Sequence, residues 1–227
     1  MQAGPRTVQG VLEEALQPVE NRRIVVHAAG RTDAGVHAAG QVVSFSLQSS
    51  IAPDALLRAL NVRLPDDVRV MHAEHVADDF HARFDARRKA YHYAIFNGPV
   101  VPPQLRHFVW HITQPLDVHA MNAAAETLLG EHDFAAFQAA GGDVISTRRE
   151  ITISHLTRQD DRLLYEVEGS GFLRHMVRNI IGTLVEIGRS RRPVDDMRRV
   201  LESRDRAHAS ATAPPHGLTL ARVEYGN

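Results

Sequence analysis

The sequence contains no cysteine among its 227 residues. Disulfides and thiolate metal ligands are therefore excluded, and the composition suits a reducing compartment. Long apolar runs are also missing, since none approaches the roughly 20 residues that span a bilayer. The N-terminus lacks a basic stretch followed by an apolar core, so no signal peptide is expected. These absences predict a soluble, cytoplasmic protein that has no membrane partner.

Lysine is almost missing as well, because Lys89 is the only lysine among 26 basic residues. Arginine suits bidentate phosphate contacts and stacking, but a bias in genomic composition is the simpler explanation of the skew. The net charge of −1 argues against a uniformly basic surface. Local basic clusters decide nucleic-acid binding, however, so the overall charge leaves an RNA partner open.

The 14 histidines are scattered along the chain. His72 with His75, His107 with His111, and the pair His132–Asp133 have the residue types of metal ligands. None of these groups has paired carboxylates at ligand spacing, and solvated or packed histidines explain them better. We therefore expect no metal site.

Apolar spacing and capping residues predict the elements of the first half. They are a helix that begins after Thr7, strands near 23–28 and 41–47, a helix that begins at Pro53, and a third strand around 68–70. The order is α-β-β-α-β, with strands packed against two helices.

The same signals predict a similar order of helices and strands in the second half. Its expected elements are a strand that carries Tyr91, Tyr93 and Ile95, a helix from Asp117 that Gly130 closes, strands near 149–157 and 162–168, a helix within 171–188, a short helix from Pro193, and a last strand near 218–225. This pattern is typical of the α+β class, with antiparallel sheets packed against helices.

A turn of glycines and alanines, "AAGRTDAGVHAAGQV" at 28–42, places Arg31, Asp33 and His37 between two expected strands. The glycine spacing fits neither a Walker loop nor a dinucleotide fingerprint. An aspartate in such a turn is usually a local cap. An arginine nearby would favour the ionised carboxylate, which could then act as a nucleophile.

The stretch "RHMVRN" carries Arg174 and Arg178, which are four residues apart and so share a helix face. Either the arginines extend to solvent from the edge of an apolar helix, or one of them opposes a carboxylate in a pocket. The residues alone leave both interpretations open. Tyr91 and Tyr93 point to one face of their strand, where a core role is commoner than stacking on a base.

Four segments taken together resemble the tRNA pseudouridine synthase A (TruA) family. They are "AAGRTDAGVHAAGQVVSF", "DDFHARFDARRKAYHYAIFN", "FLRHMVRNIIGTLVEIG" and "ATAPPHGLTLARVEY". The matching segments run in order from about residue 7 to the C-terminus, and "GRTDAGVHA" is highly specific for the family. The resemblance implies isomerisation of uridine to pseudouridine at positions 38, 39 and 40 of tRNA, in the anticodon stem-loop.

The resemblance also implies roles for single residues. Asp33 would attack the nucleotide covalently after the base has flipped out of the stem. Arg178 would pair with this aspartate, and Tyr91 would stack on the target base. Arg31 would help displace the base, while the RNA would contact Phe80, His81, Ala82, Arg83 and Phe84.

At the level of architecture, the resemblance implies two ferredoxin-like (RNP-like) domains, 1–80 and 81–227, with the active cleft between them. It also implies a homodimer that uses neither a metal nor an organic cofactor. Family members carry a further N-terminal strand before the first helix. We therefore expect either that Met1 is internal to a longer protein or that the first strand is missing.

Two alternatives follow. A missing strand would leave an open sheet edge, so a catalytically impaired RNA-binding protein of the same fold is the first alternative. The second is a glycosidase, which needs another carboxylate near Asp33. Asp85 is the nearest candidate, although its motif matches an RNA-contact segment instead.

Overall fold

The computed structural model describes residues 6–141 and 144–226, and the chain divides into two compact units. Unit 1 comprises the N-terminal residues to Arg31 together with Val42–Asp85. Unit 2 comprises Thr32–Gln41 together with the chain from Ala86 onward. The glycine-rich turn is therefore divided between the units: its first residues, to Arg31, belong to unit 1, and Thr32–Gln41 belongs to unit 2.

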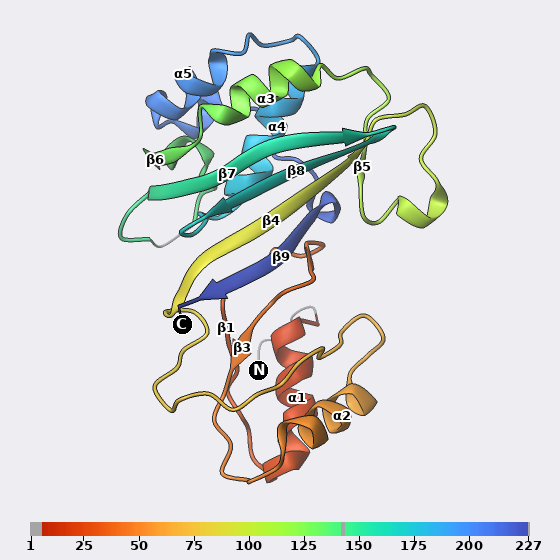
Figure 1. Cartoon of the computed structure of the whole chain (residues 1–227), viewed down its shortest axis with the longest axis vertical. Coiled ribbons are helices and arrows are strands. Elements are labelled where there is room, and N and C mark those ends of the chain that lie inside the picture. Colours follow the sequence, from red (N-terminus) through yellow and green to blue (C-terminus); the bar gives the residue numbers. More distant parts are fainter. Residues whose placement is uncertain (1–5, 142–143, 227) are drawn as a thin grey trace. The chain divides into compact units, whose positions relative to one another are not determined.

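Unit 1 is a small α+β unit (Figure 1). Its elements are α1 (Val8–Glu20), β1 (His27–Ala28), β3 (Val43–Ser44) and α2 (Pro53–Arg63). Both expected helices are confirmed, and the Thr7 hydroxyl accepts the Gly10 N–H at 3.1 Å as an N-cap. The core is formed by Leu12, Ala15, Leu16, Ile24, Val26, Leu56, Leu60 and Leu64.

The strands of unit 1 are shorter than the sequence predicts. The regions expected near 23–28 and 41–47 contribute only the antiparallel pair β1–β3. The expected strand around Val68 and Val70 is wrong, because the side chain of Asn61 bonds the N–H and the carbonyl of Val70 at 2.8 and 2.7 Å. Ile24 and Val26 are buried although they lie outside the strands. The alternation of apolar residues therefore indicated burial here, and not pairing in a sheet.

Unit 2 contains a seven-stranded mixed sheet of order β2-β9-β4-β8-β7-β6, with β5 paired to β4 (Figure 1). The strands are β2 (His37–Ala38), β4 (Ala86–Phe96), β5 (Trp110–His111), β6 (Gly130–Asp133), β7 (Arg148–Gln159), β8 (Arg162–Gly169) and β9 (Leu218–Tyr225). The predicted strands at 149–157, 162–168 and 218–225 are confirmed. The expected antiparallel pairing holds for β4–β8, β4–β9, β6–β7 and β7–β8, whereas β2–β9 and β4–β5 are parallel.

The helices of unit 2 are α3 (Val118–Glu126), α4 (Met176–Gly188) and α5 (Asp196–Ser203). Figure 1 shows all three on the same side of the sheet. Short 3-10 turns lie at Pro103–Leu105, Ala135–Phe137, Arg206–His208 and Pro215–Gly217. Almost every residue of α4 is buried, so this helix forms the centre of the core.

Two helix boundaries differ from the expectation. Helix α3 ends at Glu126, and Gly130 starts β6 at a φ of +93° instead of closing the helix. Helix α4 lies within the expected range 171–188 but begins at Met176 and so excludes Arg174, because His175 has left-handed backbone at φ +59° and ψ +5°. A left-handed residue cannot continue the helical ladder, so the backbone before it runs in another direction.

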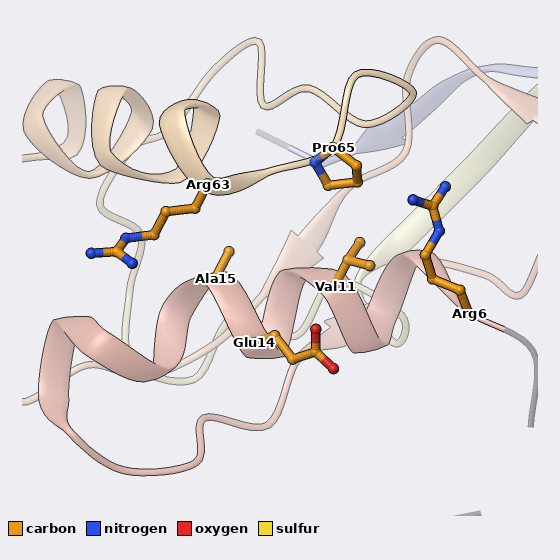
Figure 2. A pocket seen from close by; sticks show the side chains of 6 residues that line it. All are labelled: Arg6, Val11, Glu14, Ala15, Arg63 and Pro65. Carbon is orange, nitrogen blue, oxygen red and sulfur yellow. The ribbon is translucent and has the colours of Figure 1, made fainter. Parts of the chain in front are cut away.

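Among the described residues, no helix is both long and apolar enough to cross a bilayer. A shallow hollow in unit 1 lies between α1 and the end of α2 (Figure 2). Its lining residues are Arg6, Val11, Glu14, Ala15, Arg63 and Pro65. None of the predicted site residues lines it.

Candidate functional site

The segment Thr32–Gln41 is fixed along the edge of the unit 2 sheet. Strand β2 pairs with β9, and the N–H groups of Ala39 and Gly40 both donate to the Leu220 carbonyl, at 2.9 and 3.2 Å. A Cβ on Gly40 would lie 2.4 Å from the Ala221 carbonyl oxygen. A side chain at this position would collide with β9, so the glycine permits the close approach.

Gly35 and His37 give the segment further contacts. Gly35 has a φ of +82°, and a Cβ there would lie 3.1 Å from the Pro215 ring. The His37 ring stacks on Phe108 with centroids 4.7 Å apart, and its Nε2 lies 2.8 Å from the His107 carbonyl oxygen. Asp33 therefore projects from a turn whose backbone has several independent contacts.

The Asp33 carboxylate lies between two basic side chains of unit 2. Arg178 Nη1 donates to Asp33 Oδ2 at 2.8 Å, and His175 Nε2 lies 3.3 Å from the same oxygen. The Asp33 side chain is 31% exposed, against 13% for Arg178 and 25% for His175. An ion pair with this partial burial is screened less than a surface pair and is still open to a ligand.

The guanidinium of Arg178 is oriented by the segment 211–213, which lies against α4. Its Nε donates to the Ala213 carbonyl at 2.8 Å, and the Ala213 N–H donates to the Arg178 carbonyl at 3.1 Å. A Cβ on Gly182 would lie only 1.9 Å from the Ala211 carbonyl oxygen. Arg178 is thus a fixed donor rather than a side chain that extends to solvent.

Arg174 does not share this environment. It precedes α4, is exposed, and donates to the carbonyls of Ala140 and Gly141 at 2.9 and 3.4 Å. The prediction that Arg174 and Arg178 share a helix face is therefore wrong, since the left-handed His175 separates them. Of the two arginines, Arg178 contacts Asp33.

The buried side-chain amide of Asn179, in α4, connects this helix to the segment that contacts Arg178. Asn179 is fully buried and donates to the Phe137 carbonyl at 2.7 Å. Its Oδ1 accepts the Thr212 hydroxyl at 2.6 Å and Arg206 Nη2 at 3.1 Å. Buried polar groups that are satisfied in this way specify one arrangement of the segments that they join.

Tyr91 lies in β4 where the register with β9 shifts between Ala90 and Tyr91. Its ring packs edge-on against Phe172 with centroids 5.0 Å apart. Burial raises the pKa of Tyr91 to about 12, and the negative charge of the nearby Asp33 carboxylate contributes a smaller part of this increase. The phenol is therefore protonated at neutral pH and lies within the electrostatic influence of Asp33.

Tyr93 has a structural role. Burial raises its pKa, and its hydroxyl donates to the Pro214 carbonyl at 2.8 Å. That bond anchors the segment next to Ala213, whose carbonyl accepts from Arg178. Both tyrosines belong to the buried core cluster, in agreement with the strand periodicity.

The remaining predicted site residues belong to unit 1. Arg31 is exposed at the end of the first stretch of that unit. The segment Phe80–Phe84 forms a turn in which Ala82 is buried and its N–H donates to Ser44 Oγ at 3.0 Å. Phe84 is 73% exposed, and the Arg83 guanidinium lies 5.6 Å from the centre of its ring.

Within this turn, Phe80 and His81 are half-buried, and the His81 ring lies 4.3 Å from that of Phe84 between centroids. The Asp85 carboxylate accepts the His81 N–H at 2.7 Å. Asp85 therefore stabilises the turn that presents Arg83 and Phe84. This contact gives Asp85 a structural explanation and weakens the glycosidase alternative.

Sequence reasoning missed His175 and the carbonyl of Ala213. His175 has a usable signal, because it lies three residues before Arg178 in "RHMVRN". The Ala213 contact has none, since a backbone carbonyl has no residue type that marks it. Among the described residues, no group of three or more His, Asp or Glu side chains is placed to hold a metal ion.

A family model described as "tRNA pseudouridine synthase" matches residues 1–85 and 124–226. The chain belongs to this family. A relative from Shouchella clausii, named tRNA pseudouridine synthase A, is 48% identical over 227 residues, which cover 100% of this chain and 87% of the relative. Relatives of the same name from Limosilactobacillus fermentum and Moorella thermoacetica are 44% and 46% identical, covering 99% and 98% of this chain and 89% and 90% of those proteins.

Proposed function

We propose that this chain isomerises uridine to pseudouridine in tRNA, at positions 38, 39 and 40, and that Asp33 is the attacking group. The main support for the role of Asp33 is its 2.8 Å ion pair with Arg178 in a partly exposed site. Membership of the tRNA pseudouridine synthase family supplies the reaction class.

The net reaction moves the ribose from one atom of uracil to another. The bond between N1 and C1′ breaks, a bond between C5 and C1′ forms, N1 gains a proton and C5 loses one. Atoms and electrons balance within the substrate. Asp33 would form a transient ester or adduct with the nucleotide, either at C1′ or at the base, and would be released unchanged.

Arg178 would hold the attacking group in a fixed orientation. The carboxylate attacks as an anion, and the guanidinium donates to its Oδ2 at 2.8 Å. Its second bond, to the Ala213 carbonyl, fixes the direction of the guanidinium. Fixed donors of this kind stabilise changing charge without a cost of reorganisation during the reaction.

Tyr91 would stack on the target base after it has left the stem. Its protonated phenol and its packing against Phe172 give a flat, neutral surface next to the carboxylate. Base stacking on an aromatic ring contributes about 1–3 kcal/mol. Detached uracil must turn before it rejoins ribose, so a surface that holds it without a fixed hydrogen bond suits the reaction.

The residues of unit 1 would bind RNA. Arg31 would occupy the space left by the flipped base, and Phe80, His81, Ala82, Arg83 and Phe84 would contact the backbone of the stem-loop. The exposed Arg83 and Phe84 provide a cation and a stacking surface for this purpose. Arginine contacts to phosphate release counterions, so tRNA affinity would fall steeply with salt.

The finer architecture belongs to the same proposal. Each unit combines helices with a sheet, and we assign them as two ferredoxin-like domains, with the homodimer that the family resemblance implies. The domain limits of 1–80 and 81–227, the active cleft between the domains and the cytoplasmic location stay predictions.

The experiment uses tRNA labelled with tritium at C5 of uridine, because this hydrogen leaves in the reaction. Wild-type protein should release tritium from positions 38 to 40, and Asp33→Asn should bind the tRNA but release none above background. Assistance with proton transfer alone would cost about 10²–10⁴-fold and leave measurable turnover. Binding without release by the wild type would favour the impaired RNA-binding alternative instead.

A further inference from the structure

We propose that His175 is a positioning residue which, with Arg178, holds Oδ2 of Asp33 and so leaves Oδ1 as the attacking atom. This inference rests on the proposed function of Asp33. Arg178 Nη1 and His175 Nε2 lie 2.8 and 3.3 Å from Oδ2. Both basic contacts thus fall on one oxygen of the carboxylate, and Oδ1 carries neither of them.

The backbone of His175 supports a role beyond packing. Its φ of +59° puts a residue other than glycine in the left-handed region, a conformation that the surrounding structure must maintain. Glycine adopts that conformation routinely, and asparagine or aspartate does so occasionally. The contact with Asp33 uses the ring of this residue, whose Nε2 lies 3.3 Å from Oδ2.

The surrounding structure determines where the ring lies. The His175 carbonyl accepts the Asn179 N–H at 2.9 Å, and the Met176 N–H donates to the Leu173 carbonyl at 3.1 Å. These bonds fix the backbone on both sides of the ring at the start of α4. The ring is consequently presented to Asp33 from the N-cap position of the helix that carries Arg178.

The protonation state fits this role. Burial lowers the pKa of His175, the Asp33 carboxylate opposes that shift, and the positive charges of Arg178, Arg174 and Arg206 reinforce it. A neutral imidazole carries one N–H, and an Nε2 that faces a carboxylate is the nitrogen that bears it. The ring then orients the carboxylate without adding a second full positive charge, which would reduce its nucleophilicity.

The variants His175→Gln and His175→Asn separate positioning from backbone strain. Glutamine has an amide N–H that can extend toward Oδ2, but it tolerates the left-handed backbone poorly. Asparagine tolerates that backbone well, but its side chain is too short to extend to Asp33. A positioning role therefore ranks Gln above Asn in reaction rate, whereas a purely structural role ranks Asn above Gln.

The measurement is the single-turnover rate of tritium release, together with the dissociation constant for tRNA and the unfolding midpoint in urea. We expect His175→Asn to react roughly 10- to 100-fold more slowly, the effect of losing one hydrogen bond to a charged group. Its tRNA affinity should stay within about twofold of wild type. His175→Gln should recover most of the rate, even though it is the less stable of the two variants.

A rate for Asn equal to or above that for Gln would overturn the role of His175. So would losses of rate in both variants that simply follow their unfolding midpoints. Wild-type protein and Asp33→Asn, run in parallel, keep the two proposals apart. If wild type releases tritium and Asp33→Asn does not, only the role of His175 is in question; if wild type releases none, both proposals fail.

Discussion

The segment Thr32–Gln41 of unit 2 and the turn Phe80–Phe84 of unit 1 are both short connections, yet they are built in opposite ways. The first is held by β9, by Pro215 and by the stacked rings of His37 and Phe108. The second has one buried residue, Ala82, and presents Arg83 and Phe84 to solvent.

This contrast matches the two tasks that we propose for them. Covalent attack requires the carboxylate within a few tenths of an ångström of its productive position, so Asp33 needs a fixed backbone. Contacts to an RNA backbone tolerate adjustment, because phosphate attraction is long-ranged and not strongly directional. The following changes should therefore have their largest effects in unit 2.

The largest effect is expected from Arg178→Ala. It removes the 2.8 Å ion pair and leaves Asp33 without its fixed donor, so tritium release should fall by about 10²–10³-fold. Arg174→Ala is the matched control, because the side chain of this exposed arginine donates to the carbonyls of Ala140 and Gly141 and not to Asp33. Equal losses in the two variants would mean that general positive charge, rather than the pair, matters.

Gly40→Ala tests whether the fixed backbone matters. The new Cβ would lie 2.4 Å from a backbone oxygen of β9, so the segment must shift. Overpacking of this kind costs about 1–3 kcal/mol, and we expect both the free energy of unfolding and the turnover rate to fall. Gly10→Ala in α1 is the control, since its nearest atom is the Thr7 hydroxyl at 3.1 Å and alanine favours the helix. Full activity of Gly40→Ala would contradict the requirement for a fixed segment.

Arg83→Ala should weaken tRNA binding several-fold and reduce the slope of log affinity against log salt by about 1. The rate at saturating tRNA should hardly change, because the fixed site is in unit 2. Arg58→Ala on α2 is the comparison, as an exposed arginine outside the predicted contact segment. An unchanged salt slope for Arg83→Ala would remove this residue from the RNA contacts.

The smallest effect is expected from Tyr91→Phe, and only at alkaline pH. The folded-state pKa of Tyr91 is raised to about 12 from the ordinary value of 10.0, so its phenol stabilises the fold fully below pH 10. That contribution is lost as the pH rises from 10 to 12. Between these limits the free energy of unfolding of the variant should fall less than that of wild type, by about 1 kcal/mol near pH 11. Parallel pH curves from urea titrations would show that Tyr91 is not buried in solution as it is here.

The match between sequence and structure also differs between the units. In unit 2 the strands at 149–157, 162–168 and 218–225 are present as expected, because each alternates over a long ladder with one face on the core. In unit 1 the apolar residues near Ile24 and Val68 have the spacing of strands. Ile24, however, is buried without pairing to another strand. The side chain of Asn61 supplies the hydrogen bonds that a strand would have supplied to Val70.

The sequence by itself determined the family, both helices of unit 1, the long strands of unit 2 and the candidates Asp33, Tyr91 and Arg178, since motif and periodicity are local properties. Only the tertiary structure decided which arginine meets Asp33. The left-handed backbone of His175 changes the direction of the chain just before α4. Arg174 and Arg178 therefore contact different partners. Residue spacing carries no sign of that break. Nor could it have placed His175 on the same carboxylate oxygen, because that contact joins residues that are distant in the chain and depends on the pairing of β2 with β9 and on the conformation of His175 before α4.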